Sequence, residues 1–178
     1  MFFKAWRVKK IADSILAQVQ PEFIALSKAL GGLPPGFATD KFVLGFFVSC
    51  FSIAYMREGR PKFDNVTQGN ILFMVAKYTF GSSAPDPKFL GDLMNQNPPD
   101  LEFAHGQKVA VKLRAFDFSL PGSENDPDVI QAREYAKQIG TGMDFLTGPD
   151  PDGRIATGSM LLQSLLWRPI FERYKVKP

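Results

Sequence analysis

Few side chains in this sequence are of the types that act as nucleophiles, bases or metal ligands. His105 is the only histidine and Cys50 the only cysteine among 178 residues. Metal centres and nucleophilic catalysis usually need several histidine, cysteine or acidic side chains that converge on one point. Cys50 also lies in an apolar run, where a thiol behaves as a small, unreactive core residue. We therefore expect no catalytic residue, no metal site and no cofactor, and the sequence leans away from an enzyme.

Two glycine-containing segments match ligand-binding loops only in part. Gly140-Thr141-Gly142 begins like a dinucleotide-binding loop, but Phe145 occupies the third glycine position and a helical pattern precedes it. Aligning Gly153 with the glycine of a calcium loop places Ser159 where a bidentate glutamate is required. We interpret the first segment as a helix stop and the second as a surface turn.

An acidic stretch between residues 117 and 128 is the one cluster that suggests a cation or a basic partner. It contains Asp117, Glu124, Asp126 and Asp128, with no lysine or arginine between them. Asp126 is better explained as the cap of a helix, and Asp128 as an acidic residue that complements the helix dipole. Metal binding is the weaker alternative.

Positive charge is concentrated at the two ends of the chain. Residues 1–10 contain four basic and no acidic residues, and residues 168–178 contain four basic residues and one acidic residue. The ends carry +4 and +3, so residues 11–167 carry −4 if the whole chain is to reach its net charge of +3. Nucleic-acid-binding domains usually have a basic body or stripe, and this distribution argues against one.

The amino-terminal segment is the strongest candidate for contact with another molecule. This segment combines aromatic and basic residues, and a helix with that combination can bind an acidic protein, or lie on an anionic membrane or a nucleic acid. The apolar residues Val8, Ile11 and Ile15 also fit packing into the protein's own core, with the lysines in solvent, and this alternative is favoured for the segment by itself. Because chain termini often lie near each other, we expect one basic surface from both ends. The candidate interaction residues are Lys4, Trp6, Arg7, Lys10, Arg168, Arg173 and Lys175.

The aromatic content raises a second hypothesis. The chain contains 17 phenylalanines, and aromatic residues make up 13% of the sequence. These rings fit a phenylalanine-rich core, and the alternative is a pocket lined with rings that binds a small apolar molecule.

The sequence also predicts a cytoplasmic protein without a transmembrane segment. The most apolar run, 42–56, is shorter than the roughly 20 residues that a membrane-spanning helix needs. Asp13 and Gln18 interrupt the apolar stretch near the amino terminus, which argues against a signal peptide. With one cysteine, the chain can form no internal disulfide.

Apolar periodicity and capping residues predict helices along most of the chain. Pro21 lies inside the first apolar pattern, where it predicts a kink or two consecutive helices, and Pro169 predicts a kink in the last. Residues 101–118 fit a helix or a strand, and we choose helix because a lone strand has no partner. The predicted helices cover residues 8–30, 40–58, 65–80, 86–96, 101–118, 126–140 and 157–174, with another turn at 143–146.

Small residues predict a close contact on the second of these helices. Gly45, Ser49 and Ser52 recur at helical spacing, so another backbone can approach along this side. We expect an all-α fold, an irregular bundle of about six to eight helices that forms a single domain over residues 1–178. The leading hypothesis for function is a non-catalytic protein-interaction domain with an acidic partner.

Overall fold

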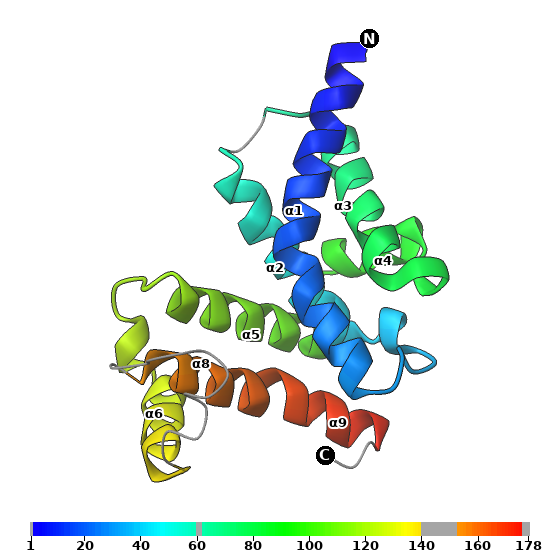
Figure 1. The fold of residues 1–178 in the computed structure, drawn as a ribbon. Coiled ribbons are helices and arrows are strands. Elements are labelled where there is room, and N and C mark those ends of the chain that lie inside the picture. The colour runs from blue at the N-terminus through cyan, green and yellow to red at the C-terminus, as the bar shows by residue number, and fades with distance from the viewer. Residues whose placement is uncertain (1, 60–61, 140–152, 176–178) are drawn as a thin grey trace. The chain divides into compact units, whose positions relative to one another are not determined.

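The computed structural model describes residues 2–59, 62–139 and 153–175, with only the backbone described for residues 2–4 and 139. These residues are mainly helical and contain no strand, so the predicted all-α fold is confirmed (Figure 1). The α-helices are α1 (Phe2–Ala29), α2 (Lys41–Arg57), α3 (Asn65–Phe80), α4 (Pro87–Asn95), α5 (Leu101–Asp117), α6 (Pro127–Ile139), α8 (Arg154–Leu162) and α9 (Arg168–Tyr174). The shorter turns are η1 (Phe37–Thr39), η2 (Gly81–Ser83), η3 (Ser123–Asn125) and the π-helical η4 (Gln163–Trp167).

The chain divides into two compact units, residues 1–110 and 111–178. The boundary lies inside α5, so this helix contributes its first part to the first unit and its last part to the second. The single domain over residues 1–178 stays a prediction.

Aspartates cap several of the helices, as predicted for Asp126. The side chain of Asp40 accepts from the Val43 N–H at 3.1 Å, and that of Asp86 accepts from the Lys88 N–H at 2.8 Å. Asp100 and Asp126 accept from the N–H groups two residues further along in the same way. Each carboxylate satisfies an amide that has no partner in the first turn of a helix.

The other predicted helix ends differ from the observed ones by up to six residues, and the largest difference is at the start of α1. The spacing of Asn65 and Gln68 in the sequence predicts a capping box, but Asp64 caps α3 instead by accepting from the Thr67 N–H, while Gln68 donates to the Phe63 carbonyl. The last helix begins at Arg154 instead of near residue 157 or 159, because Gly153 caps it in the left-handed conformation, with φ of 62°.

Of the predictions at Pro21 and at residues 143–146, the first can be tested and the second cannot. α1 continues through Pro21 as one helix, so the alternative of two consecutive helices is wrong. The turn predicted at residues 143–146 lies outside the described residues.

Phenylalanine rings form the core of the first unit. Phe23, Phe47 and Phe80 meet edge to face, with ring centroids 5.2 Å apart for Phe23–Phe80 and 5.1 Å apart for Phe47–Phe80. Phe37 and Phe46 join the same cluster, at 6.4 Å from Phe80 and 6.0 Å from Phe23. All five rings are buried, so these rings fill the space between helices by contacting one another.

Glycines bring α2 and the first part of α5 into backbone contact. A Cβ atom on Gly45 would lie 2.0 Å from the Phe103 carbonyl oxygen, and one on Gly106 would lie 2.0 Å from that of Phe42. The predicted close contact is therefore confirmed at Gly45, and Ser49 is buried as well. The prediction is wrong at Ser52, which is exposed and donates to the Val48 carbonyl.

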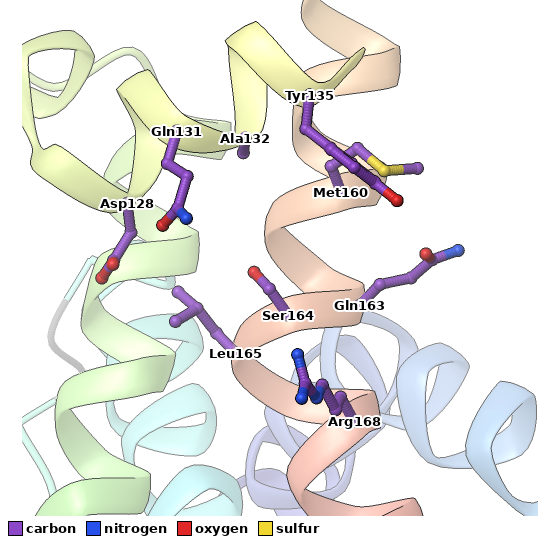
Figure 2. Close-up of a pocket in the computed structure, with 9 residues that line it drawn as sticks. All are labelled: Asp128, Gln131, Ala132, Tyr135, Met160, Gln163, Ser164, Leu165 and Arg168. Carbon is purple, nitrogen blue, oxygen red and sulfur yellow. The ribbon is translucent and has the colours of Figure 1, made fainter. Parts of the chain in front are cut away.

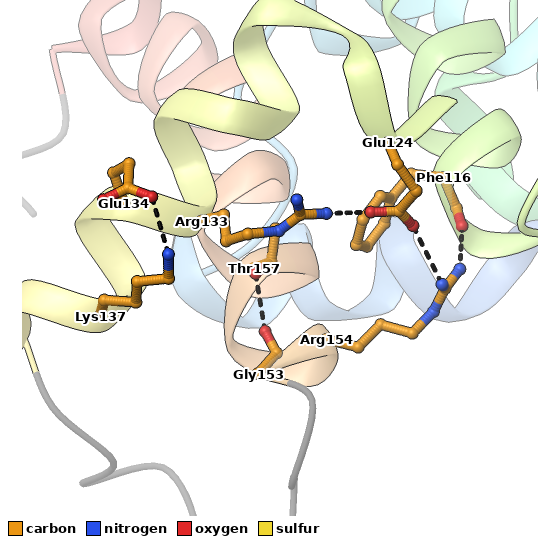
Figure 3. Close-up of polar contacts among 8 residues, drawn as sticks. All are labelled: Phe116, Glu124, Arg133, Glu134, Lys137, Gly153, Arg154 and Thr157. Carbon is orange, nitrogen blue, oxygen red and sulfur yellow. Dashed lines mark hydrogen bonds and ion pairs between the residues drawn. The ribbon is translucent and has the colours of Figure 1, made fainter. Parts of the chain in front are cut away.

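In the second unit, an arginine connects three segments around the packed pair α6 and α8. Arg154 donates to Glu124 at 3.1 Å and to the Phe116 carbonyl, and its guanidinium lies 4.8 Å from the centre of the Phe116 ring (Figure 3). Arg133 on α6 binds the other oxygen of Glu124. The end of α5, the η3 loop and the helices α6 and α8 are thereby joined.

A π-helical turn connects α8 to α9. The N–H of Arg168 donates to the carbonyl of Gln163, five residues earlier, so the helix is wider here than an α-helix. Pro169 follows at once, and in an α-helix its ring would press on the carbonyl of Leu165. The wider turn is how this helix accommodates the proline.

Candidate functional site

The start of α1 presents an exposed tryptophan among cations. Trp6 is 59% exposed, and the ammonium nitrogen of Lys10 lies 5.3 Å from the centre of its ring system. Arg7 is exposed as well, and its guanidinium carbon lies 5.6 Å from the centre of the Phe63 ring. We call Trp6, Arg7, Lys10 and Phe63 the amino-terminal face. The side chain of Lys4 lies outside the described residues.

The charge of the amino-terminal face is suited to an anionic ligand. The first turn of α1 contains no acidic residue, although carboxylates are favoured at this positive end of the helix dipole. Lys62, next to Phe63, is also exposed and adds another cation. The face can therefore offer positive charge together with an aromatic surface.

The predicted carboxyl-terminal residues lie in the second unit. Arg168 is bound to Glu172, with 2.8 Å between Nε and Oε1, so part of the positive charge is neutralised. Arg173 is exposed, and Lys175 ends α9 in the left-handed conformation, with φ of 54°. Whether these residues join the amino-terminal face in one surface stays a prediction.

The acidic stretch is occupied by the protein's own cations. Lys112 binds Asp126 at 3.1 Å and also Asp128, and the hydrogen bonds that it donates, the one to Asp128 foremost, raise the pKa of Lys112. Glu124 binds two arginines, and Asp117 binds Arg114 at 3.2 Å. Among the described residues, no three histidine, cysteine or acidic side chains converge as metal ligands.

The two residues considered for nucleophilic chemistry have packing roles. Cys50 is 2% exposed, in agreement with its predicted place in the core. His105 is exposed and meets the Phe42 ring edge to face at a centroid distance of 5.2 Å. The Gly140-Thr141-Gly142 segment lies outside the described residues.

A groove between α6 and the α8–η4 segment is a site that the sequence analysis missed. It encloses about 520 Å³ and is formed by the second unit alone (Figure 2). Its walls come from segments about thirty residues apart, and neither segment carries a motif, so no sequence signal pointed to it. The lining residues are Asp128, Gln131, Ala132, Tyr135, Met160, Gln163, Ser164, Leu165 and Arg168.

No helix within the described residues combines the length and the apolar character needed to cross a membrane. No protein-family model matches the chain, and no curated protein or solved structure matches it either. Proposals about function therefore depend on the geometry of the two surfaces.

Proposed function

We propose that the protein is a non-catalytic interaction domain that binds an acidic protein surface through the amino-terminal face. The observation that carries this proposal is the exposed indole of Trp6, with the ammonium group of Lys10 against its ring. A tryptophan that packed into the protein's own core would be largely buried instead.

Tryptophan and arginine are the residues that most often dominate binding energy at protein interfaces. Trp6 offers a large apolar surface that a partner can cover, while Arg7 and Lys10 can pair with carboxylates around it. Their contacts with Phe63 and Trp6 restrain both cations before a partner arrives, which lowers the entropy lost on binding.

The phenylalanines support this proposal over the apolar-ligand hypothesis. Phe23, Phe47 and Phe80 contact one another inside the first unit, so their surface is already used in folding. The single cysteine is buried and needs no oxidising compartment, and we propose that the domain acts in the cytoplasm.

Fluorescence of Trp6 tests the proposal in a Trp167→Phe variant, which leaves Trp6 as the one tryptophan. The probes are an octaglutamate peptide with a central leucine, an oligothymidine and phosphatidylserine-containing vesicles. We expect saturable binding of the peptide that weakens as salt shortens the Debye length from about 10 Å at 0.1 M to about 3 Å at 1 M.

Charge variants in the same background identify the surface. The double change Arg7→Gln and Lys10→Gln should weaken peptide binding mainly through the association rate. Lys28→Gln, an exposed lysine at the other end of α1, is the matched control and should bind normally. Equal binding by all variants, or binding of the oligothymidine or vesicles alone, would contradict the proposal.

A further inference from the structure

The groove between α6 and the α8–η4 segment has features of a binding site, separate from the amino-terminal face. Its volume of about 520 Å³ lies within the range of about 300–1,000 Å³ that is typical of ligand sites. Met160 and Leu165 are partly exposed and supply apolar surface, and the buried Ala132 lines the groove with them. In Figure 2, Tyr135 of α6 lies beside Met160, and Gln131 and Gln163 lie on either side of Ser164.

Polar groups around this apolar surface are available to a ligand. Within the part of the chain that the structure describes, the side chains of Gln131, Gln163 and Tyr135 have no hydrogen-bond partner. Each glutamine amide offers both a donor and an acceptor, and the tyrosine hydroxyl offers both as well. The hydroxyl of Ser164 donates to the Leu161 carbonyl, so its oxygen can still accept.

The charges at the groove are compensated inside the protein. Asp128 is bound to Lys112, and Arg168 is bound to Glu172. A charged ligand would therefore meet ion pairs instead of an unpaired opposite charge, whereas a neutral ligand with amide groups matches the glutamines.

The π-helical turn that accommodates Pro169 also forms one wall of the groove. Gln163, Ser164 and Leu165 all belong to η4 and all line the groove. Turns of this kind are rare and occur frequently at functional sites.

We propose that this groove binds a short, uncharged, extended peptide segment of a partner protein. One apolar side chain of the segment occupies the surface of Ala132, Met160 and Leu165. Its main-chain amides exchange hydrogen bonds with Gln131 and Gln163.

The lining favours this ligand over a helix or a sugar. In a helical partner, the main-chain groups are bonded to one another, so they are not free to bond with the two glutamines. Such partners also need several apolar anchors at helical spacing, and the apolar surface here is small. Three aliphatic side chains match an aliphatic anchor better than the hydroxyl-covered ring of a sugar.

Nuclear magnetic resonance of the full chain tests the proposal through the side-chain amides of glutamine. The probe is acetyl-Gly-Leu-Gly-amide, compared with the same peptide carrying Asp, Lys or Ala in place of Leu. A peptide with N-methylglycine at both glycine positions removes two main-chain donors. We expect the leucine peptide to shift the Gln131 and Gln163 amide resonances saturably, and the other probes to bind several-fold more weakly.

Variants separate the groove from the rest of the surface. Gln131→Ala and Gln163→Ala should each raise the dissociation constant of the leucine peptide by about 2- to 10-fold, the factor of one hydrogen bond. Gln138→Ala, an exposed glutamine of α6 outside the groove lining, should leave it unchanged, and circular dichroism checks that every variant is folded.

Three results would overturn this inference. The first is that millimolar leucine peptide, in 10-fold excess over the protein, causes no saturable shift of the Gln131 and Gln163 amide resonances. The second is an equal shift of the Gln138 resonance. The third is that the aspartate peptide or maltotriose binds more tightly than the leucine peptide. Octaglutamate binding at Trp6 should be normal in Gln131→Ala and Gln163→Ala, so failure at the groove is distinguishable from failure of the proposed function.

Discussion

At the scale of single residues, two glycines allow a close backbone contact between α2 and α5 in the first unit. Gly45 of α2 and Gly106 of α5 each face a carbonyl oxygen of the other helix, so neither side can retreat by changing a rotamer. The sequence indicated Gly45 through its helical spacing with Ser49. It did not indicate Gly106, because a lone glycine inside a helix does not show which helix it contacts.

A methyl group at either glycine should therefore destabilise the protein. We expect Gly45→Ala and Gly106→Ala each to lower the free energy of unfolding by about 1–3 kcal/mol or more, because backbone atoms must move. Gly69→Ala is the control, since its added Cβ would have open space on the exposed surface of α3. It should raise stability by up to about 1 kcal/mol, the helix preference for alanine over glycine. Urea denaturation of the three variants tests this prediction. Similar unfolding midpoints for all three would contradict the close contact.

The pair formed by Lys41 and Asp100 predicts a pH dependence of stability. The hydrogen bond from Lys41, 2.6 Å long, lowers the pKa of Asp100, with help from the Phe103 N–H. A carboxyl whose pKa is lowered in the folded state adds stability above its unfolded value, near 3.9, and that stability is lost as the pH falls through the folded value.

Asp100→Asn isolates this effect, because asparagine also caps helices but carries no charge. The wild type should be more stable than Asp100→Asn at pH 7, and the difference should shrink from about pH 4 downward. Urea denaturation at several pH values measures it. In a Lys41→Gln background, the stability lost through Asp100→Asn at pH 7 should be smaller. If the wild type and Asp100→Asn differed in stability by the same amount at pH 2 as at pH 7, the ionised carboxyl would have no part in the difference.

At the scale of elements, short local signals predicted the helices well and the contacts between them poorly. Asp40, Asp86, Asp100 and Asp126 each bond to an amide two or three residues away, so the sequence alone contains both partners. The start of α8 was missed because Gly153 caps it without a side chain. The groove between α6 and α8 was missed for a different reason, since packing alone brings its walls together.

Arg154 holds such a long-range contact, and its removal should cost stability. Arg154→Ala removes the bonds to Glu124 and to the Phe116 carbonyl and the contact with the Phe116 ring. We expect a loss of about 1–2 kcal/mol, at the lower end for charged hydrogen bonds because both charged partners are partly exposed.

Lys137→Ala is the matched control on the same unit. Lys137 binds Glu134 within one exposed stretch of α6, a pair whose loss should leave stability nearly unchanged because solvent screens both charges (Figure 3). Thermal unfolding compares the two variants. Equal effects would show that the Arg154 contacts contribute no more than an ordinary surface pair.

At the scale of the whole molecule, α5 is the element that belongs to both units. Phe103 and Val109 are buried in its first part, and Leu113 and Phe116 in its last part. If one unit unfolded alone, α5 would lose the packing along half its length. Helices this short depend on packing more than on intrinsic preference, so the remaining half would be weakened as well. This is the physical basis for expecting one domain.

Unfolding in urea should therefore be a single transition for residues 1–178. Cys50, 2% exposed, reports on the first unit through its reaction with a thiol reagent, which should be slow until that unit opens. Trp167, whose indole nitrogen is buried, reports on the second unit through its fluorescence in a Trp6→Phe variant. Coincident midpoints are the mark of two-state unfolding. If fluorescence changed at a urea concentration at which Cys50 was still protected, the two units would be separate domains joined by a shared helix, and the prediction of one domain would be wrong.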